Sequence, residues 1–237
     1  MKIGLIGCGS IAQIVHLNIL TKLRNAELVA LAEADPQRRE EANRRVPKAV
    51  VVADYQQLLE LPEVDAVVIC LPTHLHADAA IAAFEVGKHV YLGKPLATNL
   101  DDGRKVLEAG ETSGRIGMIG FNYHFHPLYQ KAEQQIQSGR IGELVGVRSV
   151  FATPVHTLPG WKKKRKSGGG VLLDLASHHI DLVCFLLRSA LICGLAYGLA
   201  ILCPTPSFWV GLKLIIISLV IPAGFLLLRE FSAGEIA

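Results

Sequence analysis

The stretch Gly7-Cys8-Gly9-Ser10-Ile11-Ala12 decides the fold of the first part of the chain. It follows the apolar run 2–6, which has the character of a strand, and precedes apolar residues that recur at helical spacing from 11 to 23. Gly7 permits a tight turn, Gly9 lets backbone amides approach a pyrophosphate, and Ala12 keeps the helix close to its strand. This strand-turn-helix unit predicts a dinucleotide-binding site.

Apolar runs alternate with helical stretches up to about residue 118. We expect strands at 27–32, 49–52, 65–71, 89–92 and 116–119, and helices from 36 and at 54–61, 75–86 and 101–113. Val, Ile and Leu runs without alternation are typical of strands covered on both faces, as in a parallel sheet. The sequence therefore predicts an α/β fold whose residues 1–118 form a Rossmann domain with a doubly wound parallel sheet. Asn99 is expected to cap the last helix.

Glu33 ends the second expected strand, where a carboxylate can bind the ribose hydroxyls of a dinucleotide. It would repel a 2′-phosphate, so NAD is the expected cofactor. NADP is the alternative, because Arg38 and Arg39 lie nearby. The rival acid, Asp35, precedes Pro36 and is expected to cap a helix.

Residues 71–76, Leu-Pro-Thr-His-Leu-His, follow a buried strand and so lie at the carboxyl edge of the sheet, where open α/β folds bind ligands. Thr73 and His76 are expected to point toward the cofactor. The alternative for His74 and His76 is a cap and a surface residue. No further acid or cysteine clusters with them, so no metal site is expected.

Lys94, before Pro95, ends the next strand at the same edge. Its ammonium can anchor a substrate hydroxyl and lower the pKa of that hydroxyl, and a solvated surface lysine is the alternative. A second domain, a partial α+β substrate domain at 119–187, is expected to contain helices at 128–137 and 171–187, a strand at 144–151, and a glycine hinge at 168–170.

These motifs together resemble the Gfo/Idh/MocA family of sugar and cyclitol dehydrogenases from Met1 to about Leu187. The resemblance rests on the loop 7–12, on Pro72-Thr73-His74-Leu75-His76, on Gly87-Lys88-His89-Val90 leading to Lys94-Pro95, and on the run from Gly168 to Asp181. It implies a Rossmann domain followed by a substrate domain built on an open, mostly antiparallel sheet. The implied activity is hydride transfer between NAD(P) and a hydroxyl carbon of a sugar or polyol.

The resemblance also implies a catalytic set of Lys94, Asp174 and His178. His178 would be the general base, Lys94 would steady the developing alkoxide, and Asp174 would hold an adjacent hydroxyl or orient the histidine. Asp174 and His178 are four residues apart and share one helix face, with His179 as the rival of His178. Asp181 is expected to make a structural hydrogen bond.

The cofactor-binding residues expected from the motifs and the resemblance are spread over the carboxyl edge and one later loop. They are Gly7, Gly9, Ser10, Ile11, Ala12, Glu33, Pro72, Thr73, His76, Lys94, Trp161 and Lys162. The last two stand where the family commonly has a Trp-Arg pair, and a solvated basic loop is the alternative.

Two features depart from the family. Gly93 stands where the family usually has a glutamate, and beyond Leu187 the expected alternating strands are missing. The tail 188–237 is instead a hydrophobic helical segment, in which Lys213 is the single charge between Ser189 and Leu228. Residues 208–228 are long enough for a tilted transmembrane helix, and a hairpin with 189–203 would leave Arg188 and Arg229 on one side. A pair of buried or interfacial helices is the alternative.

Composition bounds the remaining expectations. A net charge of +3 does not indicate a nucleic-acid partner. Five cysteines without a C-x-x-C pair are typical of reduced thiols. No signal peptide is recognisable, so a cytoplasmic catalytic domain is expected, with membrane contact through 189–228. The leading hypothesis is the dehydrogenase; its rivals are an inactive nucleotide-binding remnant of a truncated or fused gene, tethered to a membrane, and a transporter component. The substrate and the oligomeric state are not determined at this level.

Overall fold

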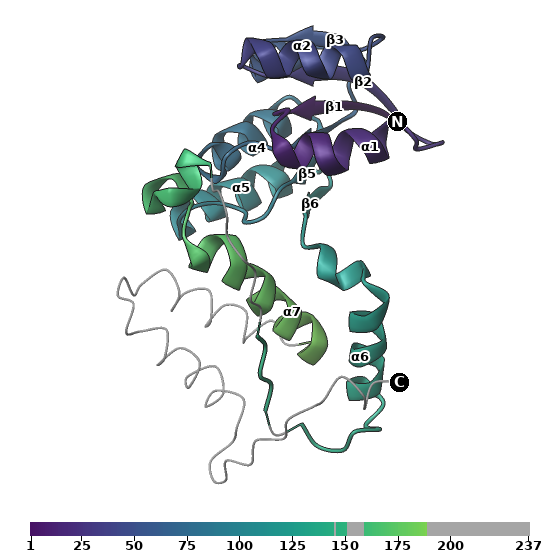
Figure 1. Ribbon diagram of the computed structural model, residues 1–237, viewed down its shortest axis with the longest axis vertical. Helices are drawn as coiled ribbons and strands as arrows, with labels where there is room; N and C mark the ends of the chain where they lie inside the picture. Colours follow the sequence, from purple (N-terminus) through teal and green to yellow (C-terminus); the bar gives the residue numbers. More distant parts are fainter. Residues whose placement is uncertain (145, 151–158, 189–237) are drawn as a thin grey trace. The chain divides into compact units, whose positions relative to one another are not determined.

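The computed structural model describes residues 1–144, 146–150 and 159–188 (Figure 1). The chain divides into two compact units. The first contains Met1–Gly120 and Gly160–Gly170, and the second contains Phe121–Pro159 and continues from Val171. The segment Gly160–Gly170, expected within the substrate domain, thus packs with the first unit.

The first unit is built on a parallel sheet in the order β3-β2-β1-β4-β5-β6. Its strands are β1 (Lys2–Ile6), β2 (Glu27–Ala32), β3 (Val50–Val52), β4 (Ala66–Ile69), β5 (His89–Leu92) and β6 (Gly117–Ile119). The order reverses between β1 and β4, which is the switch point where doubly wound sheets bind ligands. The predicted Rossmann sheet is confirmed, with β3, β4 and β6 shorter than expected.

Helices cross between the strands, as parallel pairing requires. They are α1 (Leu17–Leu20), α2 (Pro36–Arg45), α3 (Tyr55–Leu59), α4 (His76–Glu85) and α5 (Leu100–Ser113). Asp35 caps α2 by accepting from the backbone amides of Gln37 and Arg38, and Asn99 caps α5 by accepting from that of Asp102. Both predicted caps are confirmed.

Two apolar clusters cover the two faces of the sheet. One joins Ile6, Val67 and Ile69 to α3, α4 and α5, and the other joins Leu5, Leu31 and Val68 to α1 and α2. Neighbouring residues of one strand enter opposite clusters because side chains alternate across a strand. This two-sided core holds the carboxyl ends of the strands in place.

The first helix buries only part of the face that its apolar spacing predicts. Ile11, Ile14 and Ile19 are 54%, 71% and 51% exposed and Leu20 is buried, whereas Ala12 and Leu17, which lie outside that spacing, are also buried. The helix begins as a π turn, Ala12–His16, before α1. Because a π turn contains more residues than an α turn, a period counted from Ile11 at 3.6 residues does not identify the buried face.

The second unit, in its described part, consists of helices and loops. It has α6 (Pro127–Gln137) and α7 (Ser177–Leu187), with the short turns Asn122–Phe125 and Leu172–Ala176 before them. The helices are tied together by Arg188, whose Nε lies 2.6 Å from Oε1 of Glu133, and by Gln137, which donates to the carbonyl of Leu186.

The strand expected at 144–151 is not formed by the described residues of that stretch, 144 and 146–150. A strand requires a neighbour for its amides and carbonyls, and the described part of the second unit contains none. An apolar run of suitable length was therefore not enough to predict one.

The expected transmembrane hairpin, 189–228, lies outside the described residues. Within them, one helical stretch, Arg165–Leu187, is long and apolar enough to cross a membrane by length and composition. This is weak evidence, because the core helix of a soluble protein passes the same test.

Candidate functional site

The glycine loop after β1 has the shape that a pyrophosphate requires. Gly7 has φ +88°, and a Cβ there would lie 2.9 Å from the carbonyl oxygen of Cys70. A Cβ at Gly9 would meet nothing within 4 Å. Gly7 is thus required for the turn, whereas Gly9 leaves open space that a side chain would fill. Ala12 is fully buried and holds the helix start against the sheet. These residues fit a dinucleotide pyrophosphate.

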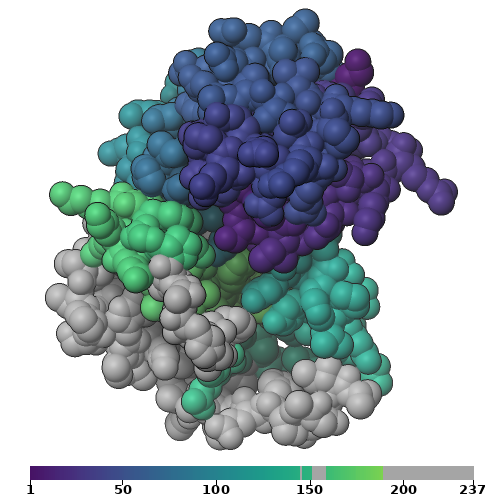
Figure 2. All heavy atoms as spheres, turned by 45° about the horizontal axis from the view of Figure 1, so that its top comes forward, coloured from purple at the N-terminus to yellow at the C-terminus, as the bar shows by residue number. Residues whose placement is uncertain are grey.

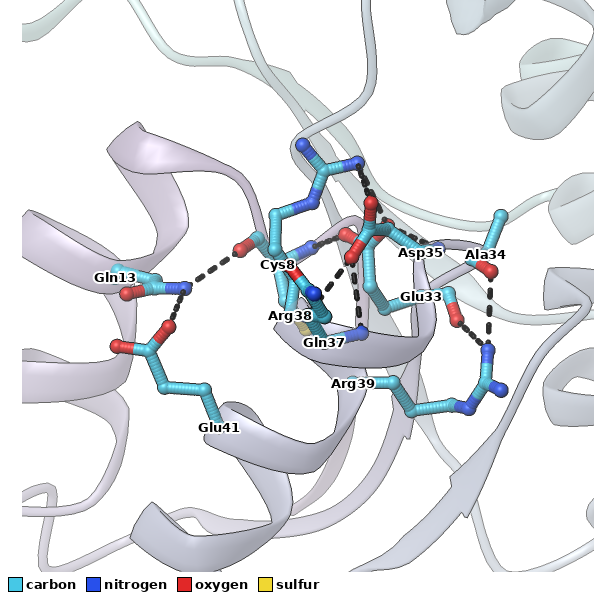
Figure 3. A network of polar contacts seen from close by, with 9 residues as sticks. All are labelled: Cys8, Gln13, Glu33, Ala34, Asp35, Gln37, Arg38, Arg39 and Glu41. Carbon is cyan, nitrogen blue, oxygen red and sulfur yellow. Dashed lines mark hydrogen bonds and ion pairs between the residues drawn. The ribbon is translucent and has the colours of Figure 1, made fainter.

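Glu33 is 6% exposed and lies beside this loop (Figure 3). Its Oε2 accepts a 2.7 Å hydrogen bond from the backbone amide of Cys8, and its Oε1 accepts from that of Asp35 at 2.9 Å. The carboxylate therefore joins the end of β2 to the glycine loop. A ribose hydroxyl that donates to Glu33 would have to share or replace these donors.

Two arginines surround the same acid. Arg38 donates from Nη2 to Oε1 of Glu33 at 3.2 Å, while Arg39 donates to the carbonyls of Glu33 and Ala34 at 2.7 and 3.1 Å (Figure 3). The guanidinium of Arg38 is half-exposed. Arg38 therefore pairs with the carboxylate of Glu33, and Arg39 holds the backbone at Glu33 and Ala34.

The two free cysteines described, Cys8 and Cys70, lie close to the switch point. Burial raises the pKa of each thiol to about 12, and the neighbouring Glu33 adds to the rise at Cys8. Both thiols are therefore neutral at physiological pH. A neutral Cys8 adds no negative charge to a loop expected to receive phosphate.

His76, at the start of α4, is buried between two loops at the carboxyl edge of the sheet. It is 2% exposed, its Nδ1 lies 2.7 Å from the carbonyl oxygen of Pro95, and its Nε2 lies 2.9 Å from that of Leu71. Burial lowers the pKa of the imidazole. The ring thus lies between the loop after β4 and the loop after β5, and a neutral imidazole can donate to one of these two carbonyls; its contact with the cofactor stays a prediction.

Lys94 follows β5 at the carboxyl edge, as predicted, and is half-buried. The peptide bond between Lys94 and Pro95 is cis. At the preceding Gly93, a Cβ would lie 3.3 Å from the carbonyl oxygen of Ile69 and 3.6 Å from the His76 ring. A side chain thus fits at Gly93 with a small adjustment.

The loop Gly160–Gly170 packs onto the segment after β4. A Cβ at Gly168 would lie 2.3 Å from Cβ of Thr73, and one at Gly169 would lie 2.1 Å from the carbonyl oxygen of Lys162. Of the three glycines expected to form a hinge, Gly168 and Gly169 are required by close packing, whereas Gly170 has φ +97° and open space around it. Nζ of Lys162 lies 5.5 Å from the ring centroid of Trp161, within range of a cation–π contact.

In the second unit, Asp174 lies in a π turn, Leu172–Ala176, and His178 lies in the first turn of α7. Both are half-buried, and the π turn that contains Asp174 comes between it and His178, so their shared helix face stays a prediction. Tyr123 stacks on the His178 ring with centroids 5.0 Å apart, and Phe121 meets it edge-on at 6.0 Å. π turns recur at functional sites, and the other one in the described chain begins the helix after the glycine loop.

Sequence reasoning missed Tyr123 and Phe121, although the aromatic run after β6 was the available signal. One of the two histidines in this run, His124, places Nε2 2.8 Å from Oδ2 of Asp181. Burial raises the pKa of Asp181, and the nearby His124 opposes that rise. Asp181 is thus a structural partner, as expected. The rival histidine, His179, contacts Oγ of Ser149.

Lys94 belongs to the first unit, and Asp174 and His178 belong to the second. Among the described residues, no three His, Cys, Asp or Glu side chains gather to hold a metal. An apolar hollow of about 290 Å³ beside α4, α5 and β6 is lined by none of the expected site residues.

The sheet order, the glycine loop and the acid beside it define a dinucleotide-binding Rossmann protein. A family model described as "Oxidoreductase family, NAD-binding Rossmann fold" matches residues 1–147, and one described as "GFO/IDH/MocA C-terminal domain" matches residues 129–192. The chain belongs to the Gfo/Idh/MocA oxidoreductase family. The resemblance predicted from the motifs is confirmed.

Several characterised relatives are similar to the chain. Levoglucosan dehydrogenase of Pseudarthrobacter phenanthrenivorans is 34% identical over 66% of this chain and 41% of its own. Myo-inositol 2-dehydrogenase of Thermotoga maritima is 30% identical over 79% of this chain and 55% of its own. The chain therefore spans about half the length of the curated relatives it matches.

Solved structures agree on the fold. An oxidoreductase of Thermotoga maritima is 33% identical, with a TM-score of 0.69 over 79% of this chain and 60% of its own. A 3-ketoreductase variant from Actinomadura kijaniata, solved with TDP-benzene and NADP, is 28% identical, with a TM-score of 0.72 over 79% of this chain and 57% of its own.

Proposed function

We propose that this chain is an NAD(P)-dependent oxidoreductase that transfers hydride between a hydroxyl carbon of a sugar or polyol and the nicotinamide. The observation that carries the proposal is the cradle at the switch point, where Gly7 is sterically required, Gly9 faces open space and Glu33 stands beside them. The relatives named for sugar and polyol dehydrogenation support the substrate class.

The nicotinamide, when bound, would supply the hydride acceptor or donor. The chain's own residues would handle the proton and the charge. His178, held by Tyr123 and Phe121, would take the hydroxyl proton, and Asp174 on the same face would orient it or hold a neighbouring hydroxyl. Lys94 would stabilise the developing alkoxide. Pro72, Thr73, Trp161 and Lys162 would border the cofactor.

Calorimetric titration of NAD into the full chain tests binding, and a panel of polyols tests turnover. We expect saturable binding, and turnover that falls by about 10²- to 10⁴-fold in His178→Gln, as for a lost general base. His179→Gln is the matched control and should retain turnover. If the His179 variant lost activity and the His178 variant kept it, the assignment of the base would be wrong.

A second candidate, nucleotide binding without turnover, is favoured by Gly93, which stands where the family usually has a glutamate. In that case NAD would bind, the polyol panel would give no reduction, and Lys94→Ala would leave NAD affinity unchanged. Fractionation of the expressed chain tests the membrane-tethered form of this candidate. Recovery in the soluble fraction would count against the tether.

A further inference from the structure

The largest concentration of charge in the chain is the run Lys162-Lys163-Lys164-Arg165-Lys166. Five of the 24 basic residues are consecutive here, so this loop carries more positive charge than the net +3 of the whole chain. The four from Lys163 to Lys166 are exposed. Figure 2 shows the green atoms of this part of the chain at the surface. Of these five basic residues, the proposed function gives a role only to Lys162, which would border the cofactor.

The loop is held rigidly by its own backbone. The amides of Gly169 and Gly170 donate to the carbonyls of Lys164 and Lys162 at 3.0 and 3.1 Å, and that of Gly168 donates to Arg165 at 2.9 Å. Two short 3₁₀ turns, Gly160–Lys163 and Arg165–Ser167, account for most of it. The lysines therefore project from a folded platform, which lowers the entropy cost of gathering them around an anion.

The position of the loop on the sheet indicates which half of the dinucleotide site lies beside it. Gly168 packs on Thr73, and Nδ1 of His74 lies 3.4 Å from the carbonyl oxygen of Ser167. Thr73 follows β4, on the opposite side of β1 from β2 and Glu33. A doubly wound sheet binds one mononucleotide in each half, so Glu33 serves the adenosine and the basic loop flanks the other half, where hydride transfer takes place.

We propose that the basic loop is an anion subsite that recognises a phosphate group carried by the substrate. The substrate would then be a phosphorylated or nucleotide-linked sugar rather than a neutral polyol. This inference rests on the proposed function, since it assumes a substrate beside the cofactor. The ammonium group of a lysine acts as a compact point charge, so it can bind a phosphate from many directions.

The test compares two triple variants of the full chain. Lys163→Gln/Lys164→Gln/Lys166→Gln removes three exposed charges from the loop. Lys22→Gln/Arg24→Gln/Lys48→Gln removes three exposed charges beside the amino ends of β2 and β3. UDP-glucose, glucose 6-phosphate and myo-inositol are titrated into each protein in the presence of saturating NADH.

We expect the wild type to bind at least one of the two phosphate-bearing probes at least about tenfold more tightly than myo-inositol, with an affinity that falls as salt is added. The loop variant should lose this preference, and the amino-edge variant should keep it. Equal affinity for myo-inositol and both phosphate probes in the wild type would overturn the proposal, while intact NADH binding would show that the proposed function still stands.

Two further outcomes assign the loop elsewhere and also overturn the proposal. A loop variant that loses affinity for NADP but not for NAD would place the 2′-phosphate of the cofactor at the loop. Retention of the wild type on vesicles containing anionic lipid, lost only in the loop variant, would make the loop a membrane contact instead.

Discussion

The carboxylate of Glu33 accepts a 2.7 Å hydrogen bond from the backbone amide of Cys8, 25 positions earlier in the chain. The residue expected to select the cofactor thus also holds the loop that receives it. The same carboxylate pairs with Arg38. Changes at this acid are therefore expected to affect cofactor choice and stability together.

Glu33→Gln should shift the ratio of NAD to NADP affinity toward NADP by about tenfold, since it removes the charge that repels a 2′-phosphate and releases Arg38. The protein should also lose about 1–3 kcal/mol of stability, because a buried charged hydrogen-bond network is weakened. Titration of both cofactors and urea unfolding measure the two effects. Asp35→Asn is the control, since it removes a charge near Arg38 but can still cap α2; an equal shift in its cofactor ratio would contradict the role of Glu33.

Gly7→Ala and Gly9→Ala should separate folding from binding. A Cβ at Gly7 meets the carbonyl of Cys70 at 2.9 Å with φ at +88°, so the alanine variant should lose about 1–3 kcal/mol of stability. Gly9→Ala meets no protein atom within 4 Å, so it should melt close to the wild type but bind NAD at least about tenfold more weakly. Thermal unfolding and calorimetry would contradict this if Gly9→Ala were the less stable of the two.

Gly93→Glu should raise turnover if the carboxylate that the family usually has before its lysine helps to position Lys94. The side chain requires a small adjustment, because its Cβ would lie 3.3 Å from the carbonyl oxygen of Ile69 and 3.6 Å from the His76 ring. A hydrogen bond to a charged group is worth about 1.5–3 kcal/mol, so an increase in kcat of about tenfold is expected. Gly93→Ala adds the Cβ without the acid and should leave kcat unchanged. An equal increase in both variants would assign the effect to a stiffer loop.

Buried His76 should make the protein less stable in mild acid. Its pKa in the folded state is below the ordinary 6.5, so between these values the unfolded chain binds more protons. The stabilising contribution of His76 is then fully present above pH 6.5. It is lost as the pH falls from 6.5 toward the folded-state pKa, by at most about 1.4 kcal/mol per pH unit. His76→Gln should lower stability at neutral pH and remove this part of the slope. Urea unfolding of the wild type and the variant at several pH values measures the difference between their slopes. Burial also lowers the pKa of His16, but both proteins contain His16, so its contribution cancels in this difference. An unchanged slope would contradict the prediction.

Local sequence patterns were sufficient to predict the sheet and the caps of two helices. The strands 2–6, 27–32 and 89–92 were predicted to the residue, because each is an apolar run bounded by turn or cap residues. Asp35 and Asn99 could be recognised because a cap depends on residues within three positions. The face of the first helix could not, because its initial π turn depends on how the loop meets the sheet.

The sequence predicted the kind of site, but it predicted only part of how the side chains are arranged. Gly7, Gly9 and Glu33 lie where the motif places them, and Asp174 and His178 lie in consecutive turns before and at the start of α7. The burial of His76 could not be predicted, because a histidine at a carboxyl edge has the same sequence signature whether it faces solvent, a ligand or two carbonyls. Its partners, Leu71 and Pro95, are determined by the packing of two loops.

By itself, the sequence determined a doubly wound cofactor domain, since strand periodicity, glycine turns and helix caps act over a few residues. Only the tertiary structure decided that Gly168 packs on Thr73, which brings the basic loop to the carboxyl end of β4. It also decided that Tyr123 stacks on His178 and that Arg38 pairs with Glu33. These contacts depend on which surfaces meet when the chain packs, and spacing along the sequence carries little information about that.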